Sequence, residues 1–76
     1  MISHTAMWRA IDNFASSRNM TCSALARLSG LDATTFNKSK RWAGGKPRWP
    51  STQSLAKIIH ATNATVEEFV ACIPKE

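Results

Sequence analysis

The stretch from Thr21 to Arg41 restricts the possible folds most strongly, because it predicts two short helices joined by a turn at Gly30. Helices that cross steeply through a short turn need a residue that tolerates unusual backbone angles, and glycine does so without a steric penalty. Asp32 follows as the expected N-cap of the second helix. The apolar residues around the turn are expected to face inward: Leu25, Ala26, Leu28, Leu31 and Phe36.

Three further segments have the periodicity of amphipathic helices, and no segment is a strand candidate of any length. The first helix is expected to follow the cap Thr5 and to end near Arg18. Another follows the cap Ser51, and the last begins at a capping box formed by Thr65 and Glu68. Their expected inward-facing residues are Met7, Trp8, Ile11, Phe14, Ala15, Leu55, Ile58, Ile59, Val66, Phe69, Val70 and Ile73. The sequence therefore predicts an all-α, compact five-helix fold, with residues 1–76 forming a single domain.

Residues 42–50, WAGGKPRWP, separate the third and fourth expected helices. Two glycines and two prolines in this stretch exclude a continuing helix and predict a basic loop. Trp42 and Trp49 bracket the loop. We expect both tryptophans to cover the core, because so small a domain usually uses its large aromatic side chains in that way, and stacking on exposed bases is the alternative.

Positive charge is concentrated in the second half of the chain, whose overall net charge is +5. No acidic residue occurs between Asp32 and Glu67. The basic residues in that interval are Lys38, Lys40, Arg41, Lys46, Arg48 and Lys57. A basic stretch of this kind favours a polyanionic partner such as nucleic acid, and a merely solvated surface is the alternative.

The chain lacks the residue patterns of a metal site or an enzyme. Cys22 and Cys72 are too few and too far apart for a zinc module, and His4 and His60 add no ligand spacing, so we expect no metal and no other cofactor. Without paired carboxylates, a Cys-His constellation or a phosphate-binding glycine motif, we expect neither catalysis nor a small-molecule substrate. No secretory signal or membrane-length apolar run is visible, which predicts a cytoplasmic protein with free thiols and no membrane partner. A disulfide between the two cysteines is the alternative.

The outer face of the helix expected after Gly30 is the candidate surface for DNA bases. Asparagine can pair bidentately with adenine, lysine can reach guanine N7 and O6, and threonine can contact the thymine methyl group. The candidate base-contacting residues are Ala33, Thr34, Asn37, Lys38 and Arg41. For these side chains, solvated surface is again the alternative.

A second set of residues is expected to contact phosphates. The helix that begins after Thr21 offers free backbone amides at its start, which suit an anion, and the lysines and arginine contribute charge. The candidate phosphate-contacting residues are Thr21, Ser23, Thr35, Lys40, Lys46 and Arg48.

TCSALARLSGLDATTFNKSKR, followed by PSTQSLAKIIHAT and TVEEFV, resembles the lambda-repressor-like helix-turn-helix family over nearly the whole chain, with the helix-turn-helix at about residues 21–41. GLDATTFNKSKR with RWPSTQSLAKI is similar to the amino-terminal domains of phage-type repressors whose carboxyl half is a LexA-like self-cleaving S24 peptidase. The resemblance implies a bacterial or phage-encoded, nucleoid-associated transcriptional regulator. It further implies a homodimer that binds double-stranded DNA at an inverted repeat, with the recognition helix in the major groove.

Two details of the resemblance bear on the site and on the extent of the protein. The family often has glutamine where this chain has Cys22, and that glutamine contacts a phosphate. Because the family usually continues beyond this domain, we expect the chain to be the amino-terminal part of a longer regulator.

Two other binding functions remain open from the sequence. The main alternative is an antitoxin of the same fold, which binds a toxin protein and represses its own operon. A long acidic or apolar toxin-binding tail would favour it, and this sequence shows none. RNA binding by the basic loop is less consistent with a chain that has no predicted strands carrying exposed aromatic residues.

Overall fold

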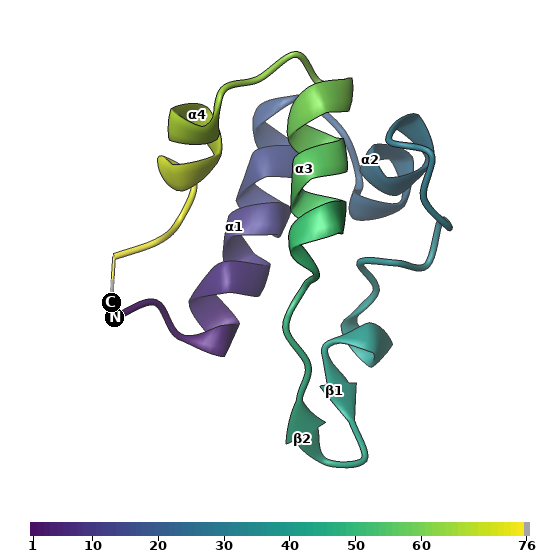
Figure 1. Cartoon of the computed structure of the whole chain (residues 1–76), viewed down its shortest axis with the longest axis vertical. Helices are drawn as coiled ribbons and strands as arrows, with labels where there is room; N and C mark the ends of the chain where they lie inside the picture. Colours follow the sequence, from purple (N-terminus) through teal and green to yellow (C-terminus); the bar gives the residue numbers. More distant parts are fainter. Residues whose placement is uncertain (76) are drawn as a thin grey trace.

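The computed structural model describes residues 1–75, and in that range it contains four α-helices, one 3₁₀ turn and a two-stranded hairpin (Figure 1). The elements are α1 (His4–Ser17), α2 (Cys22–Leu28), η1 (Lys38–Lys40), β1 (Trp42–Ala43), β2 (Lys46–Pro47), α3 (Thr52–Ala61) and α4 (Val66–Val70). Helix α1 contacts both α2 and α4, and α2 also contacts α3. The hairpin projects from the lower end of the molecule in Figure 1. A helical domain is confirmed, but five helices and the absence of strands are not.

Each α-helix begins after a serine or threonine whose hydroxyl accepts a backbone N–H of the first turn. The caps are Ser3, Thr21, Ser51 and Thr65. The predicted cap Ser51 and the capping box of Thr65 with Glu68 are confirmed. The predicted cap Thr5 is wrong, because Ser3 Oγ accepts from the Ala6 N–H at 3.1 Å and Thr5 is already helical.

One apolar core joins the helices and the segment that follows α2. Its buried members are Ala6, Trp8, Ala10, Ile11, Phe14, Ala15, Leu25, Ala26, Phe36, Ile58 and Phe69. The rings of Phe14 and Phe69 meet edge to face with centroids 5.6 Å apart, which anchors α4 on α1. Leu55 and Ile59 are half-buried against this core. Leu28 does not face inward as expected, since 51% of it is exposed at the end of α2.

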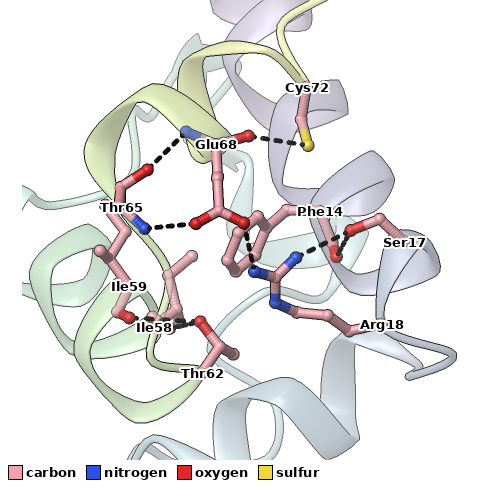
Figure 2. A network of polar contacts seen from close by, with 9 residues as sticks. All are labelled: Phe14, Ser17, Arg18, Ile58, Ile59, Thr62, Thr65, Glu68 and Cys72. Carbon is pink, nitrogen blue, oxygen red and sulfur yellow. Dashed lines mark hydrogen bonds and ion pairs between the residues drawn. The ribbon is translucent and has the colours of Figure 1, made fainter.

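Helix α4 is shorter than the expected fifth helix. After Val70 the α-helix ends in a turn, in which the Ile73 N–H donates to Val70 O at 3.0 Å. The Asn13 side-chain amide of α1 donates to Cys72 O at 2.9 Å. Val66 and Val70 are exposed rather than inward-facing. Figure 2 shows a second link between α1 and α4, an ion pair of 3.4 Å between Arg18 and Glu68.

A β-hairpin replaces the irregular loop expected between the third and fourth helices. Trp42 pairs with Pro47 and Ala43 with Lys46, in antiparallel register. Gly44 and Gly45 both have positive φ, 59° and 79°, which a two-residue type I′ hairpin turn requires of its central residues. The glycine pair therefore closes a short hairpin.

The prediction of a helix after Gly30 is also wrong. Residues 33–37 form turns and a bend, and only Lys38–Lys40 form a 3₁₀ turn. Local hydrogen bonds compete with the helix here. The Thr35 N–H and hydroxyl both donate to Asp32 O, and the Asn37 N–H donates to Thr34 O, which are bonds across three residues rather than four. Asn37 itself is extended, with φ −64° and ψ 152°. We call residues 33–41 the turn segment.

Candidate nucleic-acid interface

The turn segment presents a row of polar side chains to solvent. Thr34, Asn37, Lys38 and Lys40 are exposed, whereas Ala33 and Thr35 are half-buried. Phe36, buried in the core, anchors the middle of the segment. The exposed row thus arises from a series of turns around one anchored phenylalanine, and not from one face of a helix.

Asp32 organises the start of the turn segment without capping an α-helix. Its Oδ1 accepts from the Thr34 N–H at 2.8 Å and from the Thr34 hydroxyl at 2.7 Å. These two hydrogen bonds hold the pKa of the Asp32 carboxyl below its ordinary value. The hydroxyl hydrogen of Thr34 is therefore used inside the protein, which leaves its methyl group and the oxygen lone pairs for a partner.

Arg41 does not lie beside the exposed row as the helical prediction required. Its Nη1 and Nη2 donate to the two carboxylate oxygens of Asp12 at 3.0 and 2.7 Å, and Nη2 also donates to Phe36 O at 3.0 Å. The guanidinium lies 4.9 Å from the centroid of the Trp8 ring, and 13% of the Arg41 side chain is exposed. In this conformation Arg41 points into the protein and not toward solvent with the exposed row.

The Asp12 carboxylate joins α1, α2 and the turn segment. The Cys22 thiol, at the start of α2, donates to Asp12 Oδ1 at 3.1 Å. Burial alone would raise the pKa of Asp12, but the hydrogen bonds from Arg41 and Cys22 and the Arg41 charge bring the net pKa below its ordinary value. Burial, followed by the Asp12 hydrogen bond, raises the pKa of Cys22 to about 11, so the thiol stays protonated at neutral pH.

The lowered pKa of Asp12 makes part of the folding stability dependent on pH. A carboxyl whose pKa is lower in the folded state adds stability above its ordinary pKa, near 3.8, and that contribution disappears as the pH falls through the folded-state value. We expect Asp12→Asn to lower the free energy of unfolding at pH 7 by about 1 kcal/mol, a modest figure because solvent screens a carboxylate that is 39% exposed. Urea titrations of both proteins at pH 7 and at about pH 2 measure the difference. A difference that persists unchanged in acid would contradict a contribution from the ionised Asp12 carboxylate.

The hairpin and the residue directly after β2 carry the other cations of the candidate surface. Lys46 and Arg48 are exposed, and Thr35, Lys40 and Arg48 line one pocket together with Trp49. Three predicted phosphate-contacting residues from two segments therefore lie close together. Of the other three, Lys46 is exposed, Thr21 uses its hydroxyl to cap α2 at the Ala24 N–H, 3.1 Å away, and Ser23 is half-buried.

The two tryptophans of the hairpin do not cover the core as expected. Trp42 is 53% exposed and Trp49 is 50% exposed. Their rings meet His4 edge-on, with centroids 4.8 and 5.8 Å from the imidazole. The core position is already filled by Trp8, which is 4% exposed, so the hairpin tryptophans pack against the end of α1 instead.

Sequence reasoning missed the contribution of α1 to this surface. His4 Nε2 lies 2.7 Å from Arg41 O and 3.0 Å from Arg48 O, and the Trp8 indole N–H donates to Arg48 O at 2.8 Å. With Asp12, these residues recur every four positions, which places them on one face of the helix. That spacing is visible in the sequence, but it does not indicate which distant segment the face meets.

Comparison with known proteins decides the family. The profile of the Cro/C1-type HTH DNA-binding domain matches residues 10–75. The chain belongs to this family. No curated protein and no solved structure matches it. Membership makes the chain a helical, sequence-specific DNA-binding regulator with double-stranded DNA as its partner.

Within this Cro/C1-type domain, the match covers α2, α3, α4, the turn segment and the hairpin, but starts after His4 and Trp8. Across residues 1–75, no helix is both long and apolar enough to cross a membrane. In the same range, no three side chains of the His, Cys, Asp and Glu types are grouped so that they could hold a metal ion.

Proposed function

We propose that this Cro/C1-type domain is a phage-type transcriptional repressor that places its turn segment in the major groove of an operator. The observation that carries the proposal is the exposed row of Thr34, Asn37 and Lys38 beside a hairpin bearing Lys46 and Arg48. Hydroxyl, amide and ammonium groups can match the donors and acceptors of base edges. The proposed base contacts are Ala33, Thr34, Asn37 and Lys38, and the proposed phosphate contacts are Thr21, Ser23, Thr35, Lys40, Lys46 and Arg48.

Charge supports the assignment of the hairpin and η1 to the DNA backbone. Between Asp32 and Glu67 every charged side chain is basic, and all of them except Arg41 are exposed. Arg41 is neutralised by Asp12. A surface with such one-sided charge attracts the phosphate backbone irrespective of sequence, while the polar row supplies sequence preference.

A homodimer on an inverted repeat is the proposed bound form. One domain of this size contacts few base pairs, and two half-sites on one face of the duplex lie about 34 Å apart. The domain measures 34 × 28 × 20 Å, so two copies fit side by side at that spacing. The exposed Val70 of α4 is the proposed contact between copies, whereas Ile73 is half-buried against the core and is not available for this contact. We further propose that the regulator acts in the cytoplasm and that it has no catalytic activity.

The proposal is tested by selecting bound duplexes from random DNA and then footprinting the most enriched sequence. We expect one enriched motif with inverted symmetry and protection of both halves. Binding of all duplexes with equal affinity would contradict sequence-specific repression, and protection of one unrepeated half-site at saturation would contradict the dimer. An antitoxin would instead reveal itself by a protein partner that co-purifies and blocks or bridges the DNA complex.

Asn37→Ala and Lys38→Ala should each relax the preference at one or two defined base pairs. We expect a loss of about 1–3 kcal/mol on the selected duplex and little change on duplexes already altered at those positions. Neither side chain is buried, so both variants should melt like the parent. Competition binding against single-base variants of the selected site measures this, and a uniform loss across all sequences would remove these residues from base recognition.

A further inference from the structure

One face of α1 makes the polar contacts that hold the turn segment and the hairpin in place. His4, Trp8 and Asp12 follow one another at intervals of four residues. Carbonyl oxygens can only accept, so His4 Nε2 must carry a hydrogen to bond Arg41 O or Arg48 O. Trp8 adds the bond to Arg48 O, and Asp12 binds the Arg41 guanidinium, which in turn binds Phe36 O. This face of α1 therefore holds the backbone at residues 36, 41 and 48.

The turn segment depends on these contacts because it has no α-helix of its own. Outside its 3₁₀ turn its backbone bonds are isolated turns, and a series of turns is not self-supporting. The Phe36 carbonyl accepts from Arg41, where in a helix it would accept the N–H four residues on. The Asp12–Arg41 pair thus stabilises the non-helical conformation that displays Asn37 and Lys38.

We infer that Asp12 and Arg41 are positioning residues for DNA recognition, with Arg41 acting through the turn segment rather than as a contact to base or phosphate. The inference rests on the proposed function of that segment. It assigns the specificity of this domain partly to α1, through a residue pair separated by 29 positions in the chain. Arg41 is thereby set apart from its basic neighbours, which remain exposed.

Asp12→Asn separates positioning from simple electrostatics, because the two make opposite predictions. Removing a negative charge should tighten binding to every duplex if charge alone matters. If Asp12 positions the turn segment, affinity for the selected duplex should fall by about tenfold or more, the size of one lost base contact, while affinity for random duplex holds or rises. Arg41→Lys keeps the charge but cannot reproduce the bidentate pair, so it should lose the same affinity for the selected duplex. The double variant, Asp12→Asn with Arg41→Lys, should lose no more affinity than either single variant.

Glu68→Gln is the matched control. It removes one negative charge from the ion pair between Glu68 of α4 and Arg18, the residue that follows α1 (Figure 2). This ion pair includes no residue of the turn segment, and glutamine can still complete the capping box with Thr65. We expect the ratio of selected to random affinity to stay at the parent value. Binding is measured well below each variant's melting temperature, and His4→Ala, which removes a different contact of the same face, repeats the test should Asp12→Asn fail to fold.

The outcomes distinguish this inference from the function on which it rests. A selective parent whose Asp12→Asn variant binds the selected duplex as well or better would overturn the positioning role alone. Equal losses on selected and random duplexes would do the same, since they indicate general destabilisation. Arg41→Ala should leave the dependence of affinity on salt unchanged. A decrease in the log slope of about 0.9 for each copy bound would make Arg41 a phosphate contact instead. A parent without any sequence preference would overturn both proposals.

Discussion

Phe36→Ala should destabilise the domain by about 3–5 kcal/mol, the cost of removing a buried phenylalanine and leaving a cavity. Phe36 is 1% exposed, and its ring meets the Trp8 ring edge to face with centroids 6.5 Å apart. Domains are stable by only about 5–15 kcal/mol, and one of 76 residues belongs at the lower end. We therefore expect a substantially unfolded protein, measured as a lower urea midpoint by circular dichroism.

Trp42→Ala is the control for this effect, because it removes a larger aromatic ring that is 53% exposed. The control should shift the midpoint far less than Phe36→Ala. A Phe36→Ala variant that melts like the parent would contradict a core that depends on Phe36. Because Phe36 also anchors the turn segment, a partly folded variant should lose selective DNA binding before it loses its helical spectrum.

Raising the salt concentration from about 50 to 200 mM should weaken operator binding by about 10³-fold. The estimate follows from the cations Lys40, Lys46 and Arg48 in each of two copies, with a log slope of about 0.9 for each neutralised phosphate. All three side chains are exposed, and two of them flank or lie within the hairpin. Fluorescence anisotropy across a salt series measures the slope.

Lys46→Ala or Arg48→Ala should flatten this slope by about 0.9 for each copy bound and weaken all sequences alike. Lys57→Ala makes the same charge change on α3, outside the proposed interface, and should leave the slope close to that of the parent. A parent affinity that is indifferent to salt, or equal slopes for the hairpin and α3 variants, would exclude the hairpin from the interface.

Interactions within a few residues could be predicted from the sequence, because both partners are visible in one short window. The cap Ser51 and the capping box of Thr65 with Glu68 are of this kind. The error at the first helix was also local, since Ser3 and Thr5 are both competent caps and the structure uses the earlier one. Local patterns were misleading after Gly30. The apolar spacing there predicted a helix, but the hydrogen bonds that Thr34 and Thr35 make to Asp32 compete with it.

The sequence by itself determined the family, through the motifs that match the family profile. It also determined the basic stretch and the burial of Phe36 and Phe69 in the core, because charged and large apolar residues can be identified directly in the sequence. Only the tertiary structure decided how the candidate surface is built. The pairing of Asp12 with Arg41 depends on the packing of segments 29 residues apart, which no local pattern encodes. Arg41 accordingly points inward and the exposed tryptophans lie against α1. The turn segment is non-helical because the contacts with α1 act together with the local hydrogen bonds around Asp32, and both outweigh the apolar spacing that predicted a helix.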